Sequence, residues 1–149
     1  MPGYLFDSNV WIAATFTSHV FHGVARQALL AATPAEPAVF CRSTQQSFLR
    51  LASTPALLKA FGAEGLTHRD ALIVLNAFLA LPQVCERQEP HGLVAAWHRQ
   101  ACRDTPSPKV WMDAYLAAFA ICGGMRLVSL DQDFKNFVAG GLKFDLIRT

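Results

Sequence analysis

The chain has 149 residues, of which 52% are hydrophobic and 16% charged, and its formal net charge is +2. This length fits a single domain, residues 1–149, with a full hydrophobic core, and the composition excludes a disordered protein. A nearly neutral charge neither requires nor excludes a nucleic-acid partner, because a local basic patch can be hidden in the total.

Turn residues and apolar periodicity divide the chain into alternating strands and helices. In chain order, we expect a strand at residues 2–6, a helix at about 10–32, a strand at 38–41, a helix capped by Ser43, a short helix from Thr54, a helix at 67–81, a weak strand at 83–86, a helix at 92–102, a helix at 108–123, a strand at 126–130 and a fifth strand at 144–147. Such alternation predicts an α/β fold with a mostly parallel sheet of four to five strands, covered by helices on both faces.

The four cysteines are scattered and form no CxxC pair, so we interpret them as free buried thiols of a reducing compartment. No signal-peptide pattern is present at the start of the sequence. No apolar run reaches the roughly 18 residues that a membrane helix needs. We therefore expect a cytoplasmic protein with no membrane association.

Three aspartates lie in apolar surroundings, where a carboxylate is costly unless it is paired or binds a cation. Asp7 and Asp131 directly follow predicted strands, whereas Asp113 lies inside an almost wholly apolar helix. Since the carboxyl ends of parallel strands share one edge of the sheet, Asp7 and Asp131 are expected on the same edge. Each of these two could instead cap a helix or turn by itself, but a mid-helix aspartate has no cap to make.

A shared acidic site of this kind suits Mg²⁺ or Mn²⁺ rather than zinc, because no His or Cys ligand stands nearby in sequence. Such an ion could assist hydrolysis of a phosphodiester. Asn9 and Ser129 are spaced to orient the carboxylates through hydrogen bonds. Asp133 is either a fourth carboxylate of the site or the N-cap of the segment that follows it.

Four segments carry a resemblance to a known family. They are Leu5-Phe6-Asp7-Ser8-Asn9-Val10-Trp11, Phe48-Leu49-Arg50-Leu51, Lys109 to Ala120 around Asp113, and Arg126 to Phe134 around Asp131. The sequence resembles the PIN-domain ribonucleases of the VapC toxin group over nearly its whole length. The resemblance implies a PIN-like three-layer α/β/α fold and cleavage of RNA.

By the family's pattern, Asp7, Asp113 and Asp131 would ligate Mg²⁺ or Mn²⁺ and activate the attacking water. The resemblance also implies a small VapB-type antitoxin as partner and a homodimer. One departure is visible, because the family often has a glutamate where this chain has Gln45. The amide oxygen of Gln45 could still ligate a metal ion or hold a water, but it brings no charge, so a second metal ion would bind more weakly or not at all.

Some basic and aromatic residues near these motifs have two readings. Arg50 and Lys109 could hold substrate phosphates, or could be ordinary solvated residues. Trp111 could stack on an unpaired base, or could belong to the core or a dimer interface.

Two other functional classes stay open at this point. A haloacid-dehalogenase-like phosphatase also has an aspartate after its first strand, but it needs a second aspartate where this chain has Asn9. A nonenzymatic PIN-like module that binds RNA without cutting it is supported only by the absence of the usual glutamate. Metal-dependent cleavage of RNA would separate these classes.

Overall fold

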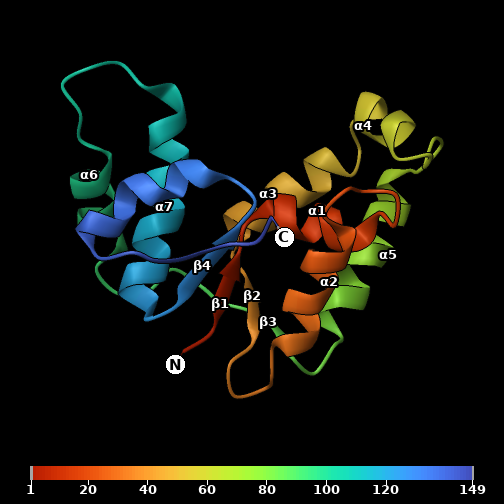
Figure 1. The fold of residues 1–149 in the computed structure, drawn as a ribbon, viewed down its shortest axis with the longest axis horizontal. Coiled ribbons are helices and arrows are strands. Elements are labelled where there is room, and N and C mark those ends of the chain that lie inside the picture. The colour runs from red at the N-terminus through yellow and green to blue at the C-terminus, as the bar shows by residue number, and fades with distance from the viewer. Residues whose placement is uncertain (1, 149) are drawn as a thin grey trace.

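The computed structural model describes residues 2–148, so the first and last residues of the predicted domain lie outside it. Five parallel strands form one sheet in the order β3-β2-β1-β4-β5 (Figure 1). The strands are β1 (Tyr4–Phe6), β2 (Ala38–Phe40), β3 (Val84–Glu86), β4 (Arg126–Ser129) and β5 (Lys143–Leu146). The prediction of a mostly parallel sheet with a fifth strand near the C-terminus is confirmed.

Eight segments of helix connect the strands. They are α1 (Ser8–Thr15), α2 (His22–Ala31), α3 (Arg42–Leu51), α4 (Pro55–Ala60), α5 (His68–Leu79), α6 (Leu93–Ala101), α7 (Pro108–Gly123) and the 3₁₀ segment η1 (Gln132–Gly140). Local end signals account for two of the helix limits that were expected: Thr67 and Asp70 form a capping box, and Gly124 ends α7 with a positive φ of 67°. None of the helices within residues 2–148 has the length and apolar character needed to cross a membrane.

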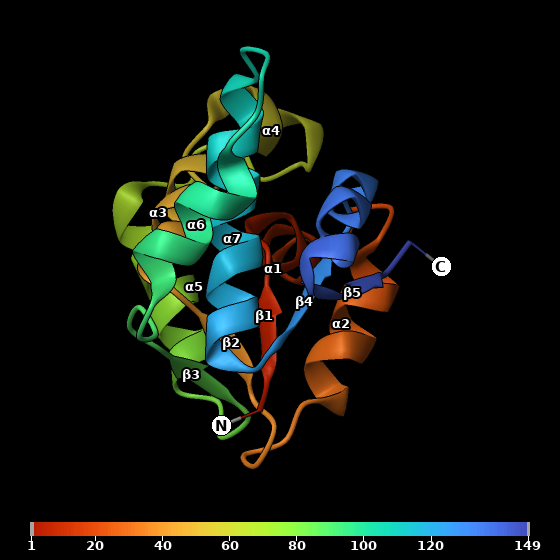
Figure 2. The same ribbon diagram turned by 90° about the vertical axis from the view of Figure 1, so that its left-hand side faces the viewer.

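The sheet separates two hydrophobic cores, because successive side chains of a strand point to opposite faces. Phe6, Phe40 and Val128 pack with α1, α2, α3 and α5 on one face, whereas Leu5, Val39 and Leu127 pack with α6, α7 and η1 on the other. Figure 2 shows α6 and α7 together in front of the sheet, as expected for the outer layer of a three-layer fold.

The predicted long helix at residues 10–32 is wrong, because the chain turns between α1 and α2. Phe16 ends α1, and the His19 ring accepts a hydrogen bond from the backbone N–H of Phe21 at 3.0 Å. Phe16 also stacks on Phe61, with ring centroids 5.0 Å apart. A local side-chain hydrogen bond and a tertiary contact thus interrupt a segment whose apolar periodicity continues.

The predicted cap at Ser43 is also wrong, since the N-cap is Cys41, two residues earlier, and α3 begins at Arg42. The Thr44 hydroxyl accepts a hydrogen bond from the backbone N–H of Cys41 at 3.0 Å and so fixes this start. All four cysteines are free, as expected, but only Cys41 is buried, whereas Cys85 and Cys122 are partly buried and Cys102 is exposed.

Candidate metal-binding site

Asp7 lies at the carboxyl end of the central strand β1, where it is the N-cap of α1. Its Oδ1 accepts a hydrogen bond from the backbone N–H of Ser8 at 2.7 Å. Burial raises the pKa of the Asp7 carboxyl, against the opposing effect of hydrogen bonds from Ser129 and Ser8. The alternative that Asp7 caps a helix is therefore correct. The cap uses only Oδ1, so Oδ2 is left for another partner.

That second partner is Ser129, the last residue of β4 and fully buried. Its hydroxyl donates to Asp7 Oδ2 at 2.8 Å and accepts from the backbone N–H of Asp131 at 2.9 Å. The Asn9 amide donates to the same hydroxyl at 3.2 Å, and its oxygen accepts from the Leu130 N–H at 3.3 Å. The structure thus brings together the two strand ends that the sequence placed on one edge.

Asp113 reaches this edge from α7, whose first turn is started by Pro108. The carboxylate is partly buried, and burial raises its pKa, although the nearby Lys109 ammonium acts in the opposite direction. Lys109 and Asp113 are spaced i, i+4 on the helix, so both side chains lie on the same face.

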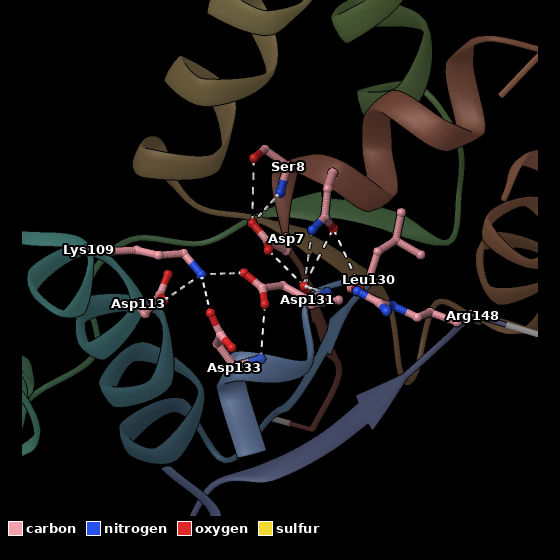
Figure 3. Close-up of polar contacts among 10 residues, drawn as sticks. Asp7, Ser8, Lys109, Asp113, Leu130, Asp131, Asp133 and Arg148 are labelled. Carbon is pink, nitrogen blue, oxygen red and sulfur yellow. Dashed lines mark hydrogen bonds and ion pairs between the residues drawn. The ribbon is translucent and has the colours of Figure 1, made fainter. Parts of the chain in front are cut away.

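Lys109 is the centre of the acidic cluster (Figure 3). Its Nζ lies 2.5 Å from Asp131 Oδ2, 2.8 Å from Asp133 Oδ2 and 3.3 Å from Asp113 Oδ2. These contacts, led by the hydrogen bond to Asp131, raise the pKa of the ammonium. Burial would raise the pKa of Asp131, but the hydrogen bond from Lys109 and the other attractive contacts outweigh it and lower that pKa.

The N-cap of η1 is Asp131 and not Asp133, so that alternative for Asp133 is wrong. Asp131 Oδ1 accepts from the backbone N–H of Asp133 at 2.9 Å, and Asp133 lies in the first turn of η1. Because its side chain also contacts Lys109, Asp133 joins the cluster as a fourth carboxylate.

Gln45 is buried in the first turns of α3, with 5% of its surface exposed. Its Oε1 accepts a hydrogen bond from the Arg42 guanidinium at 3.0 Å, and Arg42 also pairs with Glu86 at 2.9 Å. The Nε2 of Gln45 is buried and has no hydrogen-bond partner among residues 2–148. An unsatisfied buried donor of this kind is costly.

The other predicted substrate contacts are arranged differently. Arg50 is exposed and lines a cavity of about 580 Å³ formed by α3, the loop after it and α5, apart from the aspartates. Trp111 is 52% exposed, so it does not belong to the core. It borders a cavity of about 300 Å³ with Met112 and Tyr115.

The role of Lys109 in the cluster was missed from the sequence, which left a phosphate contact and an ordinary solvated residue as its two alternatives. Its spacing from Asp113 was the available signal, because opposite charges four residues apart on a helix attract each other. What the sequence did not indicate is that Asp131 and Asp133 reach the same ammonium.

The donor set fits Mg²⁺ or Mn²⁺ by its chemistry, since it consists of carboxylate oxygens. Within the described part of the chain, no three Asp, Glu, His or Cys side chains are arranged to enclose an ion as they stand. Three of the carboxylates instead converge on the ammonium of Lys109. A positive charge therefore already lies among these carboxylates, and it is the side-chain ammonium of Lys109.

This combination of fold and acidic edge is that of a PIN domain, and residues 4–139 match the family model of that name. The chain belongs to the PIN-domain family, and the resemblance inferred from its motifs is confirmed. It is 43% identical over 144 residues to Ribonuclease VapC41 of Mycobacterium tuberculosis, an alignment that covers 96% of this chain and 97% of the relative.

Two solved structures share the fold. VapC20 of Mycobacterium tuberculosis, a toxin that cleaves the Sarcin-Ricin loop, superposes with a TM-score of 0.64 at 20% identity and covers 99% of this chain and all of its own. VapBC-1 from nontypeable Haemophilus influenzae gives a TM-score of 0.59 at 14% identity, with 97% of each chain covered. At these identities the likeness shows the three-layer fold alone.

Proposed function

We propose that this protein is an endoribonuclease of the VapC type, which hydrolyses RNA phosphodiesters with Mg²⁺ or Mn²⁺. The observation that carries the proposal is the gathering of four aspartates, Asp7, Asp113, Asp131 and Asp133, at the carboxyl edge of a PIN-domain sheet. The 43% identity to a ribonuclease of that group over nearly the full chain supports it.

The candidate ligands are Asp7, Asp113 and Asp131, with Asp133 beside them. When bound, the metal supplies an electrophile for the phosphoryl oxygen and an activated water. The protein's own part is to hold the carboxylates in place: Ser129 fixes Asp7 and the backbone of Asp131, and Asn9 fixes Ser129. The Asp7 carboxylate is further held by the N-terminus of α1.

Two side chains from the start of α7 and the loop before it suit contact with single-stranded RNA. The half-exposed ring of Trp111 provides a face on which an unpaired base can stack. Arg103 lines a cavity of about 450 Å³ together with Lys109 and Asp133, where a guanidinium can contact a phosphate. Arg50 lies on another cavity and is assigned a more distant phosphate contact.

The proposal includes a VapB-type antitoxin, a homodimer and action in the cytoplasm. The fold likeness to VapBC-1 supports a partner of that type. The exposed apolar side chains of α5, Leu72 at 48% and Ile73 at 60%, provide surface for a protein partner.

The second candidate function is a PIN-like module that binds RNA without cutting it. The observation in its favour is the neutral Gln45 at the position where a glutamate is usual. The phosphatase alternative is abandoned, because the chain belongs to the PIN-domain family. In addition, Asn9 serves as a hydrogen-bonding partner of Ser129 and Leu130.

The test is cleavage of a pool of end-labelled RNAs by purified protein with Mg²⁺ or Mn²⁺, and with a chelator. Wild type should cut only with metal, and Asp113→Asn should lose at least about a hundredfold in rate, because the candidate ligand loses its charge. Asp104→Asn, which removes an exposed carboxylate from a loop, is the matched control and should cut normally. Metal-dependent RNA binding by wild type without any cleavage would instead establish the nonenzymatic module.

A further inference from the structure

The ammonium of Lys109 lies among three carboxylates at 2.5, 2.8 and 3.3 Å. Two of these, on Asp113 and Asp131, are candidate metal ligands, and the third, on Asp133, is their neighbour. An isolated exposed ion pair is worth little, but here one cation meets three anions from two separate elements, α7 and η1. The Lys109 side chain therefore links α7 to the segment that follows β4.

This arrangement determines what an incoming metal ion meets. Two cations cannot share the same carboxylate oxygens without strong repulsion, because the Coulomb energy rises as the distance falls. Asp131 Oδ2 and Asp113 Oδ2 already contact Lys109 Nζ. The ammonium must therefore leave these oxygens before a metal ion can bind to them.

We propose that Lys109 is a built-in counter-ion that occupies the cation position of the metal-free site and must withdraw before a divalent ion can bind. The inference rests on the proposed metal site and adds a competitor to it. Lys109 thereby lowers the affinity for metal, while it prevents repulsion among the carboxylates when metal is absent.

The side chain has room for this movement. The Lys109 side chain is 56% exposed, so withdrawal toward solvent buries no charge. It lines the cavity of about 450 Å³ together with Arg103 and Asn136, which lies next to the cluster. An ammonium displaced into this space would still stand beside the site, where an RNA phosphate could replace its lost carboxylates.

The first measurement is the binding of Mn²⁺ alone by calorimetry, without RNA. Lys109→Met keeps much of the side-chain volume and removes the competing charge. If the ammonium leaves the carboxylates about a tenth of the time in the free protein, its removal should tighten Mn²⁺ binding about tenfold.

Removal of any positive charge near the site would also raise the affinity for Mn²⁺, so a matched control is needed. Arg103 lines the same cavity but contacts the backbone carbonyls of Gln100 and Cys102 instead of the carboxylates. Arg103→Met should therefore change the Mn²⁺ affinity by no more than about threefold. Equal effects of the two variants, or weaker binding by Lys109→Met, would overturn the proposal.

A second measurement uses the unaltered protein and so does not depend on how the variant folds. The chain has four lysines, Lys59, Lys109, Lys135 and Lys143. Labelling with an amine reagent, read by mass spectrometry, should find Lys109 less reactive without metal, where three carboxylates pair with its ammonium, than at saturating Mg²⁺, with the other three as internal references. Unchanged protection of Lys109 at saturating Mg²⁺ would contradict the proposed withdrawal.

The outcomes separate this inference from the proposed function. If wild type binds Mn²⁺ and cuts RNA but Lys109→Met binds the ion no more tightly, only the counter-ion role is wrong. If neither protein binds Mn²⁺, the metal site itself is wrong and the counter-ion role fails with it.

Discussion

The Ser129 hydroxyl donates a hydrogen bond to the Asp7 carboxylate at 2.8 Å, although the two residues are 122 positions apart in the chain. The register of the sheet explains this contact, because Phe6 is paired with Val128 in neighbouring parallel strands. The next residue of each strand therefore emerges at the same edge. The site is built on the junction of β1 and β4.

The Ser129–Asp7 contact gives the first prediction. Ser129→Ala should lower the free energy of unfolding by about 1–3 kcal/mol, because a buried hydroxyl and its partners lose their hydrogen bonds. Ser8→Ala is the control, since its hydroxyl is 3.4 Å from the other Asp7 oxygen and the backbone cap remains. Urea unfolding of both variants checks this, and similar losses in the two would argue against a special role of Ser129.

The second prediction concerns the metal. Mg²⁺ or Mn²⁺ should restore RNA cleavage to chelated protein, whereas Zn²⁺ should restore little, because the ligands are hard carboxylate oxygens without His or Cys. Initial cleavage rates over a titration of each ion measure the preference. Full activity in excess chelator, with the protein verified as metal-free, would eliminate the mechanism.

The third prediction tests Gln45. Gln45→Glu should lower the metal concentration for half-maximal cleavage, because a carboxylate attracts a divalent ion more strongly than an amide does. Arg42, 3.0 Å from the Gln45 oxygen, can pair with the new charge and compete with the metal for it, so the gain should be smaller than for an unpaired carboxylate. Gln46→Glu is the matched control, since Gln46 is exposed one residue further on. An unchanged metal requirement in both variants would mean that this turn of α3 does not face the site.

The fourth prediction is a pH dependence of the metal-free protein. Burial raises the pKa of Asp7 above its ordinary 3.8, so the folded state holds this proton to higher pH than the unfolded state. Stability associated with Asp7 is therefore lost as the pH rises from about 4 through the folded-state pKa. Asp7→Asn removes this loss. Measured in chelator, the free energy of unfolding of Asp7→Asn should therefore increase relative to that of wild type as the pH rises from 4 to 7.

In the same experiment, the contribution of Asp131 to the free energy of unfolding should depend on pH in the opposite direction. Burial would raise its pKa, but the hydrogen bond from Lys109, the Asp133 backbone N–H and the nearby positive charges together lower that pKa in the folded state. Its contribution is present above about pH 4 and is lost as the pH falls through the folded-state pKa. Asp131→Asn should therefore be less stable than wild type at pH 7 and approach it in acid. Parallel curves for the two variants would show that neither carboxylate has the assigned environment.

Much of the fold follows from local sequence signals. Strands β1 and β4 were predicted because each is a short apolar run that ends in an aspartate motif, and α7 because Pro108 and Gly124 mark its limits. The common edge of Asp7 and Asp131 followed from the parallel sheet. These features depend on periodicity and end signals that act within a few residues.

What the sequence did not indicate depends on contacts between distant segments. The break between α1 and α2 is stabilised in part by Phe61, which follows α4 and stacks on Phe16. The Lys109 cluster needs η1 to lie against the first turn of α7. No local pattern carries such information, because these contacts are set by the packing of whole elements.

The position of β1 between β2 and β4 has a consequence for synthesis on the ribosome. Domains fold as units while the chain emerges, but β1 cannot gain its second neighbour until residues after Arg126 have left the exit tunnel. Ser129, Asp131 and Asp133 emerge together with β4 or directly after it. A nascent chain therefore carries Asp7 without its partner Ser129 while all of the residues between them are made. The acidic site is completed only after translation has passed Asp133.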